Sequence, residues 1–397
     1  MPWLEWLSLL VKWFHVVAGI AWIGASFYFI WLDNSLRTPP KWKQDKGIKG
    51  DLWAVHGGGF YEVAKYSYGP EEIPKKLHWF KWEAYSTWIS GMALLIIIYY
   101  FGAAAYLIDP SVKALTPAQA VSYGLLYIFG GLALYELACR SKLGQSPKVF
   151  ALFLVTLIVV SCWLATYLFS GRGAYIHVGA LIGTIMVGNV FFTIMPSQRK
   201  MVNAVTHKLD IDPKWGEGAK LRSVHNNYFT LPLIFIMISN HYPMTYQHQY
   251  NWLVLVAIIA VSAYIRHYFN LKHNDIHKPS ILVIGAIGMA LIALFISWPK
   301  PTTSANTEQT PQVNLSALEV NVQNIINTHC VSCHANNPTD SIFTVAPLGL
   351  KLDSWEQIQS NAQKIVNRAA ITKDMPLMNR SNMTEEERLL LVKWFNQ

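Results

Sequence analysis

The sequence predicts an all-α membrane protein, in which an eight-span transmembrane helical bundle is followed by a small α-helical domain. Three observations support this prediction. Of the 397 residues, 52% are hydrophobic and only 14% are charged. Eight mainly apolar stretches are candidates for helices that cross a bilayer, which takes about 20 residues each. After Trp298 the composition becomes polar, which marks the end of the membrane domain.

The eight predicted spans divide the first 298 residues. No positive charge precedes the first span and no small-residue cleavage site follows it, so we expect a retained helix and not a signal peptide. The sixth span is the shortest and contains Pro232, which predicts a kinked or broken helix. The spans cover residues 4–32, 78–101, 117–138, 149–169, 173–195, 226–240, 250–268 and 277–298.

The basic residues predict how these spans are oriented. The loops after spans one, three, five and seven, counted together with Arg266 and Lys278 at the adjoining ends of spans seven and eight, carry twenty Lys and Arg residues, whereas the alternate loops carry only Lys113 and Arg172. By the positive-inside rule the first set is cytoplasmic, which puts both termini in the periplasm of a bacterial inner membrane. The net charge of +9 is thus spread over the cytoplasmic loops beside membrane lipid, and it does not predict a nucleic-acid partner.

The polar segment 299–313 predicts a flexible linker, because Pro, Thr, Ser, Asn and Gln leave it little to bury. Such a coil averages about 20 Å end to end, which keeps the domain at 314–397 close to the membrane. In that domain, one helix is expected to end near Cys330. Another is expected to begin at Thr384, which has the capping-box spacing to Glu387. The apolar face of this last helix is Leu390, Leu391, Trp394 and Phe395.

The C-terminal domain contains the peptide Cys330-Val-Ser-Cys333-His334. Two cysteines separated by two residues and followed by histidine have the spacing that attaches c-type haem through two thioethers. His334 would then be the proximal iron ligand. Met375, followed by Pro376, is the expected second ligand, and Met378 is the alternative.

A zinc or redox Cys-x-x-Cys site is the competing interpretation of this peptide. A zinc site would need a second pair of ligands, and the only other cysteines, Cys139 and Cys162, lie far upstream in apolar segments. They are expected to be small buried thiols.

A glycine-rich cytoplasmic loop is the first candidate for chemistry in the membrane domain. Residues 57–59 are three consecutive glycines, which allow a tight turn and a close approach to a planar ligand. His56 could move a proton near neutral pH, and Lys65 could balance negative charge. The alternation of residues around the glycines also fits a hairpin, or merely a tight aromatic-rich turn on the membrane surface.

Polar side chains recur near the cytoplasmic ends of the predicted spans. Ionisable groups at membrane depth are costly and usually face a cavity or a partner. Lys81, Arg222 and Arg266 individually also fit snorkelling to the interface. The candidates include Lys81 and Glu83 on span two, Glu136 on span three, Asn189 on span five, Arg222, His225, Asn226 and Asn227 near span six, and Arg266 and His267 on span seven.

His15 lies about 17 Å into the first span, near the centre of the bilayer. It could simply be hydrogen-bonded within the bundle. Alternatively, it could ligate a b-type haem together with His177, near the outer end of span five, and so provide an electron stepping stone. His241 is another possible ligand on the outer side.

Three segments carry a family resemblance, namely residues 53–62 (WAVHGGGFYE), 68–83 (YGPEEIPKKLHWFKWE) and 194–199 (IMPSQR). Together with the eight-span layout, they resemble the bacterial membrane-bound urate hydroxylases. In that family a multi-helix urate oxidase domain is fused to a C-terminal cytochrome c domain. The resemblance implies a transmembrane urate oxidase domain at 1–298, the linker at 299–313 and a cytochrome c domain at 314–397.

The resemblance also implies an activity. Urate would be oxidised to 5-hydroxyisourate in purine degradation, with water as the oxygen source. Its electrons would pass through haem c, bound by Cys330 and Cys333 and ligated by His334 and Met375, to an external cytochrome c or a terminal oxidase. The family often has a second proline after Met-Pro, where this chain has Leu377, so Met378 stays open as an iron ligand.

Urate is a planar anion that gives up electrons more readily after losing a further proton, so a base and charge-stabilising groups are needed. A haem b is attractive because electrons would otherwise cross ~30 Å of hydrocarbon. The competing classes are a membrane electron-transfer protein that relays between haem b and haem c, and a urate transporter with an attached cytochrome. The candidate residues are His56 and His225 as bases, Lys65, Lys81 and Arg222 as anion-binding groups, and Glu62 and Glu83 as groups that orient a histidine or a water.

Overall fold

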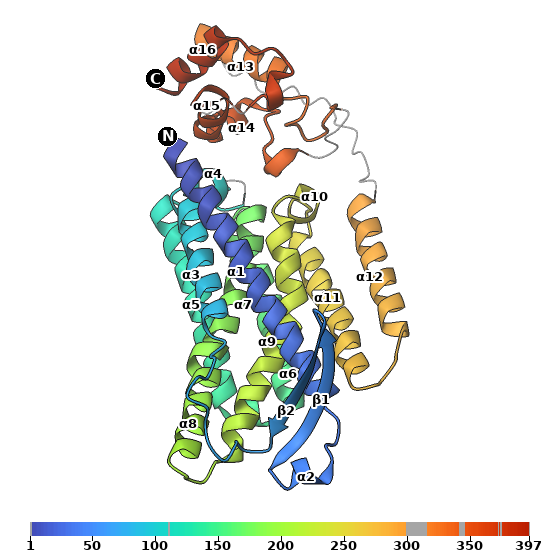
Figure 1. Cartoon of the computed structure of the whole chain (residues 1–397). Coiled ribbons are helices and arrows are strands. Elements are labelled where there is room, and N and C mark those ends of the chain that lie inside the picture. The colour runs from blue at the N-terminus through green and yellow to red at the C-terminus, as the bar shows by residue number, and fades with distance from the viewer. Residues whose placement is uncertain are drawn as a thin grey trace.

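A computed structural model describes residues 2–109, 112–298, 316–340, 346–371, 373 and 375–396. The predicted linker at 299–313 lies outside these residues. The described chain forms a bundle of long helices with a smaller helical domain at one end and a β-hairpin toward the other (Figure 1). The long helices are α1 (Pro2–Ser35), α3 (Trp82–Leu94), α5 (Pro117–Arg140), α6 (Pro147–Leu168), α7 (Gly171–Asn189), α9 (Pro213–Ser239), α11 (Asn251–His273) and α12 (Ser280–Ser297).

Six helical segments of the described chain are long and apolar enough to cross a membrane. They are α1, α5, α6, the continuous helix Gly171–Thr206, α11 and α12. That continuous helix joins α7 to η3 (Val190–Ile194) and α8 (Met195–Thr206), so it runs well past the predicted end at residue 195. The other two predicted spans are helices of the same bundle that lie outside this set of six.

The second and sixth predicted spans differ from expectation in their bounds. The helix of the second begins at Trp82 and continues from α3 into η1 (Leu95–Tyr100), so residues 78–81 are not part of it. The sixth is the second half of α9, whose first turns are polar. Of the kink or break expected at Pro232, the break is wrong, because α9 continues through that residue over 27 residues.

Helix α7 lies at the centre of the bundle, and almost all of its side chains are buried. It packs against α3, α5, α6 and α9 (Figure 1). Small residues allow this close packing, as at Gly179, where an added Cβ would lie 2.8 Å from the Ile236 side chain on α9. The short helices α4 (Ala103–Tyr106) and α10 (Pro243–Tyr246) lie at the end of the bundle near the smaller domain, and η2 (Lys142–Gln145) connects α5 to α6.

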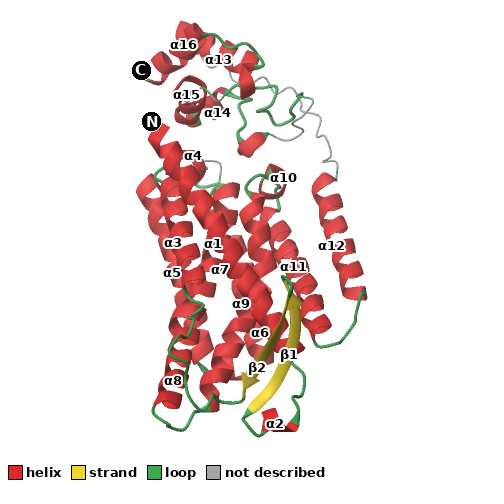
Figure 2. Cartoon of the chain, in the orientation of Figure 1, coloured by secondary structure: helices red, strands yellow, loops and turns green. Residues whose placement is uncertain are grey.

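The all-α prediction is wrong in one element, an antiparallel hairpin of β1 (Ile48–His56) and β2 (Gly59–Tyr66) that follows α2 (Lys41–Gln44). Figure 2 shows it as the pair of strands in an otherwise helical chain. His56 pairs with Gly59 across a two-residue turn, in which Gly57 and Gly58 have φ of 57° and 82°. Positive φ at both positions is what a type I′ turn requires, so consecutive glycines suit this hairpin. The alternative hairpin interpretation of the loop is therefore confirmed.

The C-terminal domain has its own apolar core. Ser316 and Thr384 cap its first and last helices, α13 (Ala317–His329) and α16 (Glu385–Phe395), each with a capping box. The predicted box of Thr384 and Glu387 is thus confirmed, and Leu391 and Trp394 are buried as expected, whereas Phe395 is exposed. Between these helices lie η4 (Pro347–Gly349), α14 (Trp355–Ser360), α15 (Ala362–Val366), η5 (Asn367–Ile371) and η6 (Leu377–Asn379).

The C-terminal domain contacts the end of the bundle opposite the strands of the hairpin (Figure 1). The side-chain amide of Gln247 donates a hydrogen bond of 2.7 Å to the carbonyl oxygen of Ala346. Arg368 donates to the Tyr106 hydroxyl at 3.3 Å. These two contacts tie the domain to the loop after α10 and to the end of α4.

Candidate functional site

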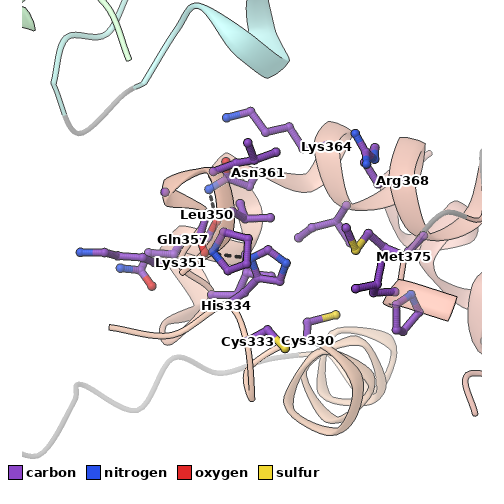
Figure 3. Close-up of a pocket in the computed structure, with 18 of the residues that line it drawn as sticks. Cys330, Cys333, His334, Leu350, Lys351, Gln357, Asn361, Lys364, Arg368 and Met375 are labelled. Atoms are coloured by element: carbon purple, nitrogen blue, oxygen red, sulfur yellow. Dashed lines mark hydrogen bonds between the residues drawn. The ribbon is translucent and has the colours of Figure 1, made fainter. Parts of the chain in front are cut away.

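A cavity of about 650 Å³ is lined mostly by the C-terminal domain, and Cys330, Cys333, His334 and Met375 all line it (Figure 3). Helix α13 ends at His329, and the backbone N–H of His334 bonds to the carbonyl oxygen of Cys330 at 2.8 Å. This turn places the two cysteines and the histidine on one wall. The predicted C-x-x-C-H residues are therefore brought together with Met375, which is 41 residues further on in the chain.

The hydrogen bond of His334 defines its tautomer. Nδ1 lies 3.1 Å from the carbonyl oxygen of Leu350, which can only accept, so Nδ1 carries the proton. Nε2 is left with its lone pair. Burial lowers the pKa of His334, so the ring is held neutral, and burial raises the pKa of the Cys330 thiol to about 12. A neutral imidazole with a free Nε2 is the form that binds metals.

Two hydrogen bonds fix the backbone of Met375. Its N–H bonds to the carbonyl oxygen of Arg368 at 3.1 Å, and its own carbonyl oxygen accepts from Arg388 at 2.9 Å. The side chain of Met378 lies outside the described residues, so the choice between the two methionines stays a prediction. Within the described part of the chain, no group of three or more His, Cys, Asp and Glu side chains is placed to hold a bare metal ion.

The membrane domain supplies one wall of this cavity. Tyr106 and Asp109 follow η1, whereas Ser170 and Arg172 lie at the start of α7. The Arg172 guanidinium lies 5.3 Å from the centre of the Tyr106 ring and 5.7 Å from that of Tyr99. The cavity is thus shared between the two domains and is not confined to the C-terminal one.

The candidate residues of the hairpin have different surroundings. His56 is exposed at the tip of β1. Glu62 forms an ion pair with the buried Lys43, which also binds Asp51. Lys65 pairs with Asp33, near the end of α1. Glu62 and Lys65 therefore hold the hairpin together and attach it to the bundle, whereas His56 is exposed at the tip.

Lys81 and Glu83 lie at the N-terminus of α3. Lys81 is the N-cap residue, with its Nζ 5.9 Å from the centre of the Trp82 ring. Glu83 Oε1 lies 3.8 Å from His78 Nε2, while its buried Oε2 has no hydrogen-bond partner among the described residues. As expected from their spacing, the two side chains do not pair with each other.

Arg222 and His225 lie one turn apart on α9 and share a partner, Tyr135 of α5. The Tyr135 hydroxyl lies 2.7 Å from His225 Nδ1, and its ring centre lies 5.1 Å from the Arg222 guanidinium. Arg222 also donates to Glu136 at 2.9 Å and to Asn189 at 2.8 Å. Two of the candidate residues therefore lie together, but the charge of Arg222 is already balanced by the Glu136 carboxylate.

Arg266 of α11 does not reach the membrane surface by snorkelling, because it is only 4% exposed. Its Nε donates to Asn227 Oδ1 at 3.1 Å, and its guanidinium lies 4.0 Å from the centre of the Phe27 ring. It lines a cavity of about 470 Å³ between α1, α9 and α11.

Comparison with protein families identifies the membrane domain. The family described as "Urate oxidase N-terminal" matches residues 2–297. The chain belongs to this urate oxidase family. Neither curated proteins nor solved structures gave a match. Membership indicates an oxidoreductase that acts on urate, and the match ends just before the predicted linker.

In this urate oxidase family member, the histidines proposed for a haem b do not fit that role. His177 donates from Nδ1 to the Gly173 carbonyl oxygen at 2.8 Å, which leaves Nε2 for iron. However, an added Cβ on Gly124 would lie only 2.6 Å from that Nε2, and the Tyr100 hydroxyl is 3.4 Å away. An iron and a porphyrin have no room there.

His15 contacts α3, whose continuation η1 carries the Tyr100 that lies beside His177. Its Nδ1 is 3.0 Å from both the Thr87 carbonyl oxygen and the Ser90 hydroxyl, as the hydrogen-bonded alternative predicts. His241, the other possible ligand, is exposed after α9. His15 and His177 therefore do not form a haem b site in the described structure.

Two residues of the urate oxidase domain that sequence reasoning did not place in a site are Arg266 and Asn227. Both were visible as polar residues in an apolar segment. Nothing in the spacing shows that they meet, since 39 residues separate them. The sequence also gives no sign that Phe27 of α1 covers the guanidinium.

Proposed function

We propose that this protein is a membrane-bound urate hydroxylase that passes electrons from urate to a covalently bound haem c. One observation carries the proposal. Cys330, Cys333, His334 and Met375 line one cavity in a domain that contacts the end of a urate oxidase domain. The proposal includes eight spans, with both termini and the haem domain periplasmic, and it rests for this on the alternation of basic loops.

The residues around the cavity suit haem c. Two thiols on one turn could form thioethers to a haem, and the Nε2 of His334 and the sulfur of Met375 would hold its iron. The volume falls in the range of small-molecule and cofactor sites. When bound, the haem would accept electrons one at a time from the membrane domain.

The chain's own residues would bind urate, take its proton and admit water. The balanced reaction adds one water to urate and releases 5-hydroxyisourate, two protons and two electrons. The proposed proton acceptors are His56, which is exposed at the hairpin tip, and His225, which is hydrogen-bonded to Tyr135. Their role follows from the need to remove a proton before the anion gives up electrons. Electrons would then leave to an external cytochrome c or a terminal oxidase.

The decisive experiment is anaerobic. Urate is added to membranes that contain the oxidised holoprotein, and the haem c absorbance is followed. We expect reduction by urate and not by xanthine, together with loss of the urate absorbance band. The double variant C330A/C333A should contain no covalent haem and show no reduction. Haem that stays ferric with excess urate would refute the proposal, and urate uptake without bleaching would indicate a transporter instead.

A further inference from the structure

The cavity between α1, α9 and α11 is walled mainly by aromatic rings. Phe27, Tyr28 and Trp31 come from α1, and Phe269 comes from α11. Arg266 and His273 are the basic residues that line it. Its volume of about 470 Å³ lies within the range of small-ligand sites, and flat, apolar walls suit a planar ring.

Arg266 at this cavity is buried with incomplete partners. Within the described part of the chain, its Nη2 has no hydrogen-bond acceptor and no carboxylate oxygen lies within ion-pair distance of its guanidinium. Asn227, which is fully buried, accepts from Arg266 Nε but leaves its own Nδ2 without an acceptor. Among the described residues, the donors Arg266 Nη2 and Asn227 Nδ2 thus have no acceptor, and the charge of Arg266 has no counter-charge.

The other buried arginine of the bundle shows how such a charge is normally balanced. Arg222 binds Glu136 and Asn189, which satisfy its guanidinium with a carboxylate and an amide oxygen. An unpaired charge at membrane depth costs several kcal/mol and usually marks a functional site. The positive charge of Arg266 therefore has no anionic partner among the described residues.

We infer that Arg266 and Asn227 form the binding site for the urate anion, which deepens the proposed function and rests on it. A guanidinium is planar, stays charged, and can bind a carbonyl or oxyanion while it stacks on an aromatic ring. The free Nη2 of Arg266 and Nδ2 of Asn227 would donate to oxygens of the purine ring. The ring itself would lie against the aromatic side chains of α1.

Phe27 has a specific part in this site. Because Nη2 is covered in the structure, a ligand must move a neighbouring side chain to reach it. Phe27, whose ring centre is 4.0 Å from the guanidinium, is the side chain that we expect to turn aside. In the structure the Phe27 ring covers the guanidinium.

The position of the cavity also indicates the side of the membrane from which urate enters. Trp31 is two residues before Asp33, which pairs with Lys65 of the hairpin. His273 is two residues before Asp275, which pairs with Arg37 at 2.8 Å. The site therefore lies beside the attachment of the hairpin and away from the haem domain (Figure 1), on the side that the basic loops predict to be cytoplasmic.

The test measures urate binding without turnover. Anaerobic holoprotein reduced with dithionite cannot accept electrons from urate, so equilibrium dialysis with urate gives a dissociation constant. We expect Arg266→Gln to weaken urate binding at least about 10-fold, the cost of one lost charge-assisted hydrogen bond. Its thermal midpoint should equal or exceed that of the unchanged protein, because an unpaired buried charge has been removed. Arg37→Gln, which removes an exposed cation at the same end, should bind urate normally.

An Arg266→Gln protein that binds urate with unchanged affinity would overturn the inference. If that variant fails to fold, Trp31→Leu provides the second measurement, and it should weaken urate binding several-fold through lost stacking. Unchanged affinity in Trp31→Leu would likewise overturn the site. Normal haem reduction by urate combined with unchanged binding in Arg266→Gln would refute this site alone. Urate binding that depends on Arg266, without any haem reduction, would refute the proposed function alone.

Discussion

Arg222 Nη1 of α9 lies 2.9 Å from Glu136 Oε1 of α5, and both side chains are largely buried. Asn189 of α7 accepts a second hydrogen bond from the same guanidinium nitrogen and donates to Asn226 at 2.8 Å. The network joins three helices of the bundle. Sequence reasoning proposed Arg222 as an anion-binding group, but its geometry is that of a satisfied ion pair, which contributes chiefly to packing specificity.

Arg222→Gln should destabilise the protein strongly. Removing one partner of a buried ion pair leaves the other charge uncompensated, at a cost of about 3–5 kcal/mol. The thermal midpoint in detergent should fall, and combining it with Glu136→Gln should restore part of the loss. Arg140→Gln is the matched control, since Arg140 binds the same carboxylate from an exposed position at 3.2 Å. Equal midpoints for the two arginine variants would contradict this prediction.

His56→Ala should leave stability within about 0.5 kcal/mol, because the side chain is exposed. If His56 takes the proton from urate, kcat should fall by about 10²–10⁴-fold. His207→Ala, at the exposed end of α8, changes a histidine elsewhere on the surface and should leave turnover intact. Full turnover in His56→Ala would remove His56 from the mechanism and leave His225 as the candidate.

Met375→Ala should lower the reduction potential of the haem, since a thioether ligand raises it relative to nitrogen ligands. The measurement is a redox titration of the haem absorbance in purified protein. Met383→Leu is a suitable control, because Met383 is buried in the core of the same domain and the substitution conserves volume. A normal potential in Met375→Ala would transfer the ligand role to Met378.

Glu387 makes the C-terminal domain sensitive to acid. The backbone N–H of Thr384, and then the side chain of His329, hold the pKa of Glu387 below its usual value of 4.5. A carboxyl with a lowered pKa stabilises the fold above its unfolded pKa, and this contribution disappears as the pH falls through the folded value. Glu387→Gln keeps an acceptor at the N3 position of the capping box but removes the charge, so it should cost about 1 kcal/mol at neutral pH.

The comparison of thermal midpoints by circular dichroism from about pH 7 to about pH 3 tests this linkage. The difference between Glu387→Gln and the unchanged protein should shrink in acid. Glu386→Gln, an exposed neighbour in the same first turn, should lower the midpoint much less. A difference that is constant with pH would show that the Glu387 charge does not contribute.

The local features of the chain followed from the sequence because they depend on neighbours in the chain. The capping box of Thr384 and Glu387 and the end of α13 at the C-x-x-C-H peptide are set by groups three or four residues apart. The hairpin was visible in the glycines after His56, although the fold class left it out. The break expected at Pro232 failed because packing against neighbouring helices can maintain a helix that local propensity alone would interrupt.

Residue type and short spacing were enough to indicate the membrane helices, the C-x-x-C-H peptide and the family. Only the tertiary structure decided which buried charges are balanced. Arg222 and Arg266 look alike in the sequence, yet one meets Glu136 on another helix, whereas the polar partner of the other among the described residues is Asn227, beside the Phe27 ring. Electrostatic compensation depends on distances of a few ångströms between helices that are far apart in the chain, and these distances are set by how the whole bundle packs.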